Sequence, residues 1–437
     1  MDYAPVIGFE VHVELGTASK MFCGCPANHF GVPPNTQTCP VCLGLPGALP
    51  VPNQKAIEWT VKLGLALGCQ VNLFSKFDRK NYFYPDLSKS YQISQYDLPF
   101  CEKGQLTLPS GKTIRITRVH LEEDTGKLQH ATVNEDKVTL IDFNRSGVPL
   151  VEIVTEPDFD NADDGVEFLK EIQQIVRAIG ISAADMEKGS MRLEANVSVK
   201  PRDQKGLPKY KVELKNINSF RFIKKAIDYD VKRQIDILEK GETPTQETRG
   251  FSESTNKTFS QRSKEEANDY RYFPEPDIPP ITLTSQQIDS WKKDTPRLPA
   301  QIRNSLLNLG IPPISTATIS QNPEYLKLLT EAVALDPQTP PVEYAHLLVN
   351  KRYGDVLPTS AQALVELKYS QAKIGVDQEV LKNIIAQVIL ENPSVVEDYK
   401  AGKTQVIGFL IGKANNLLEG KGDPREIRER LLQLLNQ

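Results

Sequence analysis

The fold is decided by a stretch near the N-terminus, residues 8–15, which reads GFEVHVEL. At the two-residue period of a β-strand, its apolar side chains share one face, while Glu10, His12 and Glu14 share the other. One apolar and one polar face are typical of a strand in an antiparallel sheet. We therefore expect a half-buried strand here, whose polar face carries an imidazole between two carboxylates.

Four further strand-like segments carry acidic side chains on an ordered face. They are RVHLEEDTGK (118–127), GVPLVEIVTEPD (147–158), MRLEANVSV (191–199) and KYKVELKNINS (209–219). Together they contribute Glu122, Glu123, Glu152, Glu194 and Glu213, with Arg192 and Lys215 beside them. For any one strand a solvated polar face explains the pattern, but its repetition along the chain weighs against that explanation.

Glu152 differs from the other acids because its strand is apolar on both faces. A carboxylate buried there must find a cation or hydrogen-bond donors, since burying it alone is costly. If the acidic faces line one concave sheet, repulsion among the carboxylates calls for divalent cations. Oxygen ligands with one imidazole suit Mg²⁺ or Mn²⁺. Such a site would bridge nucleotide phosphates and a carboxylate substrate during phosphoryl transfer.

Four cysteines form two close pairs, Cys23-x-Cys25 and Cys39-x-x-Cys42, with 13 residues between the pairs. This spacing is typical of a tetrahedral zinc site in which each pair binds one edge of the ion. Because all four ligands would come from the protein, the zinc would be structural. The alternative interpretation is four reduced thiols in a loop without metal.

Residues 78–97, DRKNYFYPDLSKSYQISQYD, interleave basic and aromatic side chains. The basic residues are Arg79, Lys80 and Lys89, and the aromatic residues near them are Tyr82, Phe83, Tyr84 and Tyr91. Cations among aromatic rings suit phosphates and a stacked base or ribose, so we take the three basic residues as candidates to contact a nucleotide. A tyrosine-rich surface loop without a ligand explains the pattern equally well.

The segment LPSGKTIRI (108–116) contains Gly-Lys-Thr, but we do not expect it to form a phosphate-binding loop. The first glycine of that motif would stand at the position of Leu106, and the flanks read as two strands rather than a strand and a helix. Ser110 and Gly111 are better explained as a hairpin turn. The sequence also contains no G-x-G-x-x-G, so a nucleotide site would need another architecture.

The composition is that of an ordinary globular protein. Of 437 residues, 39% are hydrophobic and 25% are charged, and the net charge is −4. The length predicts two to four domains, and the mild acidity leaves room only for a local basic patch. No apolar run approaches the roughly 20 residues needed to cross a bilayer, and no signal or transit segment is visible. We therefore expect no membrane association and a cytoplasmic location, or an organellar one.

Three regions of the chain differ in character. Residues 1–284 are rich in strands and end at the stacked prolines of FPEPDIPP; within them we expect two amphipathic helices, at 162–179 and 220–240. Residues 285–395 follow a helical pattern. We expect residues 396–437 to form a small helical module, which has seven Lys/Arg and four Asp/Glu between positions 400 and 430.

Six strings, in this order along the chain, closely resemble the B subunits of the aspartyl/glutamyl-tRNA amidotransferases. They are IGFEVHVEL, FDRKNYFYPDLSKSYQISQ, HLEEDTGK, DFNRSGVPLVEIVTEPD, KVELKNINSF and DYRYFPEPDIPP. The tail VIGFLIGKANNLLEGKGDP is similar to the C-terminal tRNA-binding module of that family. The resemblance runs from about residue 5 to about residue 430, and its strings are too long for coincidence.

The resemblance implies an α+β fold. It comprises a largely antiparallel, sheet-based "cradle" domain akin to glutamine synthetase, then a helical domain and a small helical tail module. It also implies a heterotrimer with an amidase subunit, which releases ammonia from glutamine, and a small third subunit. The chain would bind misacylated Glu-tRNA(Gln) or Asp-tRNA(Asn) and phosphorylate the side-chain carboxylate with ATP and Mg²⁺. Ammonia would then displace the phosphate, which makes the enzyme an ATP-dependent carbon–nitrogen ligase.

The family's magnesium positions are carried over by matching motifs. They fall on Glu10, His12, the Glu122/Glu123 pair and Glu152, with Glu194 and Glu213 in the same basin. Relatives commonly have Cys-Asp where this chain has Leu193-Glu194, so the carboxylate reaches one methylene further. The resemblance also makes Arg192, Lys215 and Asn216 candidates to hold phosphate or the activated acyl group. Glu14 has no role carried over and is interpreted as an ordinary polar-face residue.

Two other functions fit parts of the pattern. A carboxylate–amine ligase for a small molecule would use the same metal site but would not need the basic tail. A zinc-bearing tRNA-binding scaffold without catalysis would tolerate Glu10→Gln or Glu152→Gln. The chain also lacks the Gly/Ser-rich stretch with Ser-Ser-Lys of an amidase, so we expect no glutaminase activity from it alone.

Overall fold

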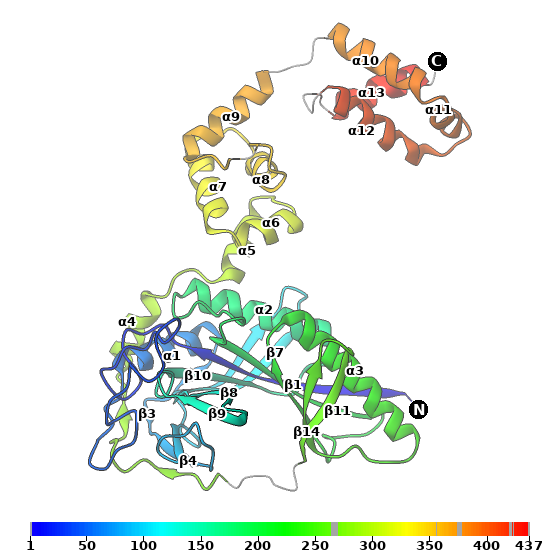
Figure 1. Cartoon of the computed structure of the whole chain (residues 1–437). Helices are drawn as coiled ribbons and strands as arrows, with labels where there is room; N and C mark the ends of the chain where they lie inside the picture. The colour runs from blue at the N-terminus through cyan, green and yellow to red at the C-terminus, as the bar shows by residue number, and fades with distance from the viewer. Residues whose placement is uncertain are drawn as a thin grey trace. The chain divides into compact units, whose positions relative to one another are not determined.

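The computed structural model describes residues 2–263, 270–354, 356–373, 378–418, 422 and 424–435. The chain divides into two compact units, Met1–Gln301 and Ile302–Gln437, and each is described by itself (Figure 1). The first unit is built on a sheet, and the second is helical.

A nine-stranded sheet forms the centre of the first unit. Its strands, in spatial order, are β14 (Lys257–Ser263), β13 (Glu247–Ser252), β12 (Val212–Ile217), β11 (Met191–Pro201), β1 (Tyr3–Glu14), β10 (Pro149–Thr155), β7 (Thr113–Glu123), β6 (Cys101–Thr107) and β2 (Gln70–Val71). Every pairing is antiparallel except that of β12 with β13. The prediction of a largely antiparallel sheet in an α+β fold is confirmed, and all of GFEVHVEL except its last residue lies in the central strand, β1.

Three helices cover one face of this sheet (Figure 1). They are α1 (Gln54–Ala66), α2 (Ala162–Ala178) and α3 (Phe220–Glu239). The apolar face of β1 packs under them: Phe9 is 1% exposed, and its ring lies 6.2 Å from that of Phe168 in α2. Helices α2 and α3 fall where the sequence predicts them, because a polar side chain caps each N-terminus and a glycine with positive φ follows each C-terminus.

The Gly-Lys-Thr segment lies in the β6–β7 hairpin, as predicted. β6 ends at Thr107 and β7 begins at Thr113. Gly111 between them has a φ of +90°, which glycine adopts without a steric penalty. A strand therefore stands where a phosphate-binding loop would need a helix.

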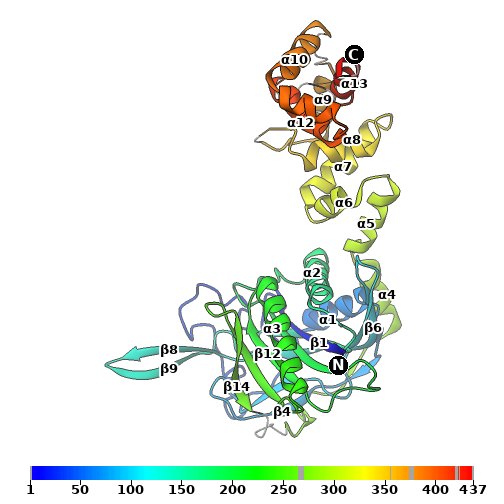
Figure 2. The same ribbon diagram turned by 90° about the vertical axis from the view of Figure 1, so that its right-hand side faces the viewer.

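Smaller sheets join distant parts of the first unit. β4 (Asp78–Asn81) pairs with both β5 (Tyr91–Ser94) and β15 (Phe273–Pro274). β3 (Phe74–Ser75) pairs with β16 (Ile281–Thr282). β8 (Lys127–Val133) and β9 (Asp136–Asp142) form a hairpin that projects from the rest of the unit (Figure 2). α4 (Ser285–Lys293) follows β16.

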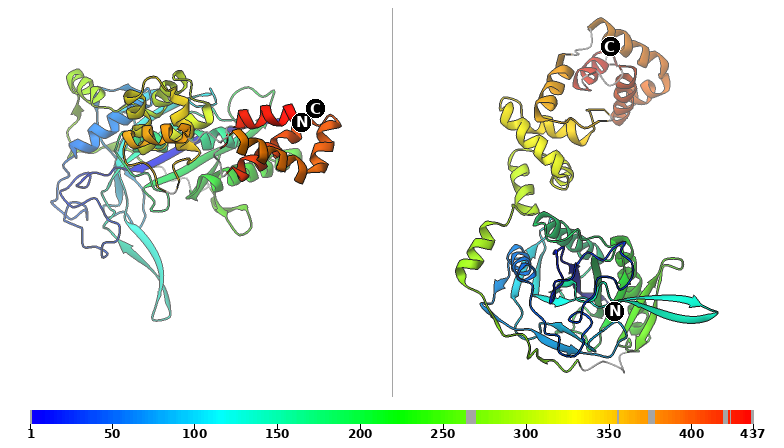
Figure 3. Two further views of the ribbon diagram at one scale, coloured as in Figure 1. Left: turned by 90° about the horizontal axis from the view of Figure 1, so that it is seen from above. Right: turned by 60° about the vertical axis from the view of Figure 1, so that its left-hand side comes forward.

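The remaining helices are short, and most begin at a proline. They are α5 (Pro299–Asn308), α6 (Pro313–Ser320), α7 (Pro323–Leu335), α8 (Pro341–Val349), α9 (Ala361–Lys373), α10 (Gln378–Glu391), α11 (Pro393–Lys400), α12 (Ile407–Leu417) and α13 (Pro424–Leu435). Helices α5–α9 gather in one group and α10–α13 in another (Figure 3). Buried apolar side chains form one cluster in each group. The division at 284 and 395 stays a prediction. Among the described residues, no helix is both long and apolar enough to span a bilayer.

Candidate active site

The polar face of β1 lies in a row of charged side chains that crosses four strands. His12 stands opposite Glu152 of β10 on one side and Arg192 of β11 on the other. Glu152 in turn stands opposite His120 of β7. In the next row Glu10 stands opposite Glu194. Acids that are far apart in the sequence therefore gather on the face of the sheet opposite the helices, as the alternation predicts.

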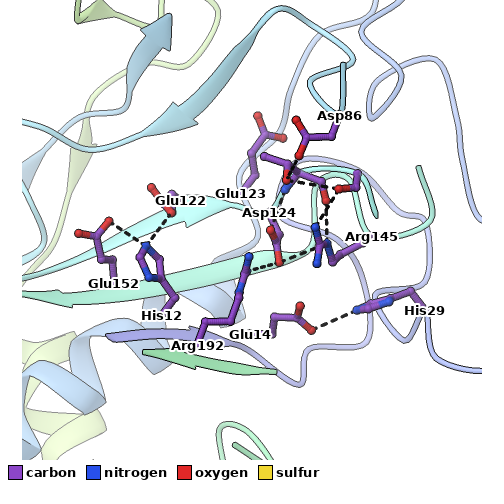
Figure 4. A network of polar contacts seen from close by, with 12 residues as sticks. His12, Glu14, His29, Asp86, Glu122, Glu123, Asp124, Arg145, Glu152 and Arg192 are labelled. Atoms are coloured by element: carbon purple, nitrogen blue, oxygen red, sulfur yellow. Dashed lines mark hydrogen bonds and ion pairs between the residues drawn. The ribbon is translucent and has the colours of Figure 1, made fainter. Parts of the chain in front are cut away.

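The first acidic cluster consists of His12, Glu122 and Glu152, whose ligand atoms lie within 4.8 Å of one another. His12 Nε2 lies 3.3 Å from Glu152 Oε2 and 3.9 Å from Glu122 Oε1 (Figure 4). Both carboxylates are buried, and Ser94 donates a hydrogen bond to Glu122 at 2.9 Å. Glu152 has therefore found the partners that its buried strand requires.

His120 belongs to the same group and was not among the predicted site residues. Its Nε2 lies 3.2 Å from Glu152 Oε2 and 3.6 Å from Glu122 Oε2, and the side chain is buried. Arg118 donates to its Nδ1 at 3.3 Å, which leaves Nε2 to donate to the carboxylates. The sequence could have indicated it, because His120 and Glu122 are two residues apart in one strand and so share a face.

Cations balance the charge of the first acidic cluster. Burial alone would lower the pKa of His12, but nearby carboxylates, Glu152 foremost, raise it to about 9. Burial would likewise lower the pKa of Lys80, but Glu122 and Glu152 raise it above its usual range. Lys80 therefore keeps its ammonium charge beside this cluster. Its contact with a nucleotide stays a prediction.

The second acidic cluster consists of Glu10, Glu194 and Glu213, again with ligand atoms within 4.8 Å of one another. Lys215 Nζ lies 2.9 Å from Glu194 and 3.2 Å from Glu213. Asn196 donates to Glu10 at 2.8 Å. The three carboxylates and the lysine have formal charges that sum to −2, so the donor set fits a divalent cation with oxygen ligands.

Glu123 and Asn216 were both predicted for this site, but they lie outside both clusters. Glu123 points to the opposite side of β7 from Glu122, because adjacent side chains of a strand alternate. Its carboxylate accepts from Lys89 at 2.9 Å and from the Ile93 amide at 3.0 Å. Asn216 has a φ of +59° where the register of β12 with β11 shifts, and its side chain is exposed.

Arg79 is bound to an acid far away in the sequence. Its Nε and Nη2 donate to the two oxygens of Glu275 at 2.7 and 2.8 Å, and the guanidinium lies over the ring of Tyr91 at 4.4 Å. Glu275 is buried, so this two-point ion pair fixes the chain after β15 beside β4. Its assignment to a nucleotide stays a prediction.

Glu14 is buried, so its interpretation as an ordinary polar-face residue is wrong. Its carboxylate lies 3.1 Å from Nε2 of His29, which belongs to the loop between the two cysteine pairs (Figure 4). Nearby, Asp124 binds Arg192 and lies 3.7 Å from Arg145. Against the effect of burial, the two arginines hold the pKa of Asp124 well below its usual range.

The four cysteines meet as their spacing predicts. Their sulfurs lie within 4.8 Å of one another, and those of Cys39 and Cys42 are 3.9 Å apart. Two sulfurs bound at about 2.3 Å in a tetrahedron would be about 3.8 Å apart. A hydrogen bond from Cys23, foremost, lowers the pKa of Cys42 to about 4, and the buried Lys20 lies 3.6 Å from the same sulfur. The thiolate is the form that binds metal, so the donor set fits zinc.

Comparison with known proteins confirms the resemblance found in the sequence. The family model described as the GatB/GatE catalytic domain matches residues 5–289, and that described as the GatB domain matches residues 355–435. Two relatives named as aspartyl/glutamyl-tRNA(Asn/Gln) amidotransferase B subunits, from Thermomicrobium roseum and Thermodesulfovibrio yellowstonii, are 42% and 40% identical over 100% of this chain and 99% and 100% of their own. A third, from Thermoanaerobacter sp., is 42% identical over 97% of this chain and 98% of its own. The chain belongs to the family of aspartyl/glutamyl-tRNA(Asn/Gln) amidotransferase B subunits.

Proposed function

We propose that this chain activates the side-chain carboxylate of Glu-tRNA(Gln), Asp-tRNA(Asn) or both, and then amidates it. It would work in a heterotrimer with an amidase subunit and a small third subunit, in the cytoplasm. The observation that carries the proposal is the convergence of two acidic clusters on one sheet face, in a chain that belongs to this family.

The chemistry explains why such a site is needed. A carboxylate is a poor acyl donor because oxide would have to leave. In the first step a carboxylate oxygen bonds to the γ-phosphorus of ATP, and the bond to the ADP oxygen breaks. In the second step ammonia from the amidase subunit attacks the acyl carbon, the carbon–oxygen bond to phosphate breaks, and the nitrogen loses a proton. The products are the amide, ADP and phosphate.

Magnesium ions at the two acidic clusters would neutralise the negative charge that develops on the phosphoryl group during transfer. The residues that would hold them are Glu10, His12, Glu122, Glu152, Glu194 and Glu213. His12 would bind as the neutral imidazole, so it would release its proton when the metal ion binds. The fit rests on the oxygen-rich donor sets and on the formal charge of −2 at the second acidic cluster. Glu123 would not bind these ions but would hold Lys89 through an ion pair.

Basic side chains at the edges of the clusters would hold the phosphate and the acyl group. Lys80 lies beside the first acidic cluster and Lys215 within the second. Arg192 binds Asp124, while its buried Nε has no hydrogen-bond partner among the described residues. A buried donor without a partner is costly, so this N–H is suited to a phosphate oxygen.

Three further parts of the proposal concern the scaffold. The sheet with helices on one face would be a glutamine-synthetase-like cradle. Zinc at Cys23, Cys25, Cys39 and Cys42 would fix the loop that carries His29. The C-terminal module from residue 396 onward would bind tRNA through its basic residues.

The direct test is ATP hydrolysis by the complex reconstituted from this chain, the amidase subunit and the small subunit, with and without each misacylated tRNA. We expect hydrolysis to rise only with a correctly misacylated tRNA, and we expect no glutaminase turnover from this chain alone. Stimulation by free glutamate or aspartate, unaffected by deletion of residues 396–437, would instead favour a small-molecule ligase. Full activity of Glu10→Gln would favour a non-catalytic scaffold.

A further inference from the structure

Four tyrosines gather at the edge of the candidate active site. We call them the tyrosine cluster: Tyr82, Tyr96, Tyr270 and Tyr272. Tyr96 and Tyr272 are stacked, with ring centroids 4.3 Å apart and planes 10° apart. Tyr270 meets Tyr272 edge to face at 6.0 Å and Tyr82 at 5.8 Å. Aromatic rings thus form a continuous group drawn from two segments almost 200 residues apart in the sequence.

The small sheet of β4, β5 and β15 builds this cluster. Tyr82 follows β4, Tyr96 follows β5, and Tyr270 and Tyr272 precede β15. The Asn81 amide donates to the Tyr270 carbonyl at 2.8 Å, which fixes the two segments side by side. Two rings remain open to solvent: Tyr96 is 55% exposed and Tyr270 is 40% exposed. A contiguous exposed aromatic surface is uncommon unless it binds something.

Lys80 lies between the tyrosine cluster and the first acidic cluster. Lys80 Nζ is 5.1 Å from the centroid of the Tyr270 ring, and the same ammonium faces Glu122 and Glu152. Burial, opposed by Lys80, raises the pKa of Tyr272 to about 12, so its ring stays neutral at physiological pH. A ligand that stacks on these rings would therefore have its next atoms beside a cation and the first acidic cluster.

We propose that the tyrosine cluster stacks the unpaired nucleotides at the 3′ end of the tRNA acceptor stem. This inference rests on the proposed function, because it requires the aminoacyl end of a tRNA to reach the acidic clusters. Bases without a pairing partner expose their faces, and aromatic side chains bind such faces irrespective of sequence. The open rings favour a flexible strand over a small nucleotide, which needs a more enclosed pocket.

The test compares leucine and phenylalanine variants at the two stacked positions, in the complex with the amidase and small subunits. Tyr96→Leu and Tyr272→Leu keep an apolar side chain but lose the flat ring, whereas Tyr96→Phe and Tyr272→Phe keep the ring. The probes are intact deacylated tRNA, the same tRNA trimmed of its single-stranded 3′ end, and ATP alone. Thermal unfolding of each variant shows that it folds.

We expect each leucine variant to bind intact tRNA about 10-fold more weakly or worse, since stacking on one aromatic ring contributes that much. The phenylalanine variants should bind like the unaltered chain, trimmed tRNA should not distinguish any variant, and the KM for ATP should not change. A 2-aminopurine base at the 3′ terminus should be quenched by the unaltered chain and by the phenylalanine variants only.

Equal binding of intact tRNA by the leucine and phenylalanine variants would overturn the inference while leaving the proposed function standing. A rise in the KM for ATP alone would overturn it too, because the cluster would then hold the base of ATP. Loss of the amidase or the small subunit from the leucine variants would make the cluster a protein interface and would also contradict it. If the unaltered complex bound no tRNA at all, the proposed function itself would fail.

Discussion

The two acidic clusters share a sheet face but differ in how their charge is balanced. In the first, the carboxylates of Glu122 and Glu152 are only 2% and 7% exposed, and two imidazoles and the Lys80 ammonium lie beside them. In the second, Glu194 and Glu213 are 18% and 13% exposed, and Lys215 lies between them. The first can therefore fold without a metal ion, whereas the second retains negative charge that a cation would neutralise.

This difference separates two roles. A buried carboxylate with matched partners is fixed in place and tuned for chemistry, because its geometry has few alternatives. A half-buried group with excess negative charge attracts a hydrated divalent cation from solution. We expect substitutions in the first cluster to act mainly on the rate of phosphoryl transfer, and those in the second to act mainly on the affinity for Mg²⁺.

The largest effect is expected for Glu152→Gln. The tRNA-dependent rate of ATP hydrolysis should fall by on the order of 10³-fold, because the amide keeps the shape of the side chain but removes its charge. Glu58→Gln is the matched control and should keep its activity: Glu58 pairs with Lys55 and Lys62 on α1, which covers the opposite face of the sheet. Unchanged hydrolysis by the Glu152 variant would mean that this cluster has no catalytic role.

Glu213→Gln should act differently. We expect the Mg²⁺ concentration that gives half-maximal activity to rise by about 10-fold, with most of the maximal rate recovered at high Mg²⁺. The measurement is a magnesium titration of the tRNA-dependent rate, run beside Glu58→Gln. A large loss of maximal rate without a shift in the titration would erase the distinction between the two clusters.

Cys42→Ser tests the proposed zinc site, which lies apart from both clusters. If Cys42 binds zinc, its loss should lower the midpoint of thermal unfolding by about 5 °C, because structural zinc contributes to folding. A strong chelator should lower the midpoint of the unaltered chain by a similar amount and should not affect the variant further. If the chelator changed neither protein, the site would hold no structural metal.

The smallest effects come from one hydroxyl at each cluster. Ser94 donates to Glu122 at 2.9 Å and is buried, whereas Thr248 donates to Glu213 at 3.0 Å in a more exposed place. Ser94→Ala should lower the free energy of unfolding by about 1–2 kcal/mol, and Thr248→Val by less than about 1 kcal/mol. Urea unfolding measures both losses. A larger loss for Thr248→Val than for Ser94→Ala would mean that burial does not decide how much these two hydrogen bonds stabilise the fold.

Much of the site could be predicted because strand alternation is a local property. GFEVHVEL and its four companion segments each show which side chains share a face, and the sheet joins those faces. Helices α2 and α3 carried their own capping signals. The spacing of the four cysteines was enough to predict that they meet.

The remainder depended on contacts between distant residues. Glu122 and Glu123 were predicted as a pair, but neighbours on a strand point to opposite faces, so only Glu122 reaches the first acidic cluster. Arg79 is held by Glu275, and no local pattern links two residues so far apart. The local pattern around Glu14 indicated a solvated side chain. The structure instead places His29, from the loop between the cysteine pairs, beside the Glu14 carboxylate.

In the proposed reaction, the substrate carboxylate is phosphorylated before it is amidated. The most direct measurement uses misacylated tRNA with ¹⁸O in the side-chain carboxylate and follows the label during ATP-dependent amidation by the reconstituted complex. We expect one ¹⁸O atom in the phosphate released for each amide formed, because the carboxylate oxygen leaves with the phosphoryl group. Amide formation that releases phosphate without the label would contradict the account.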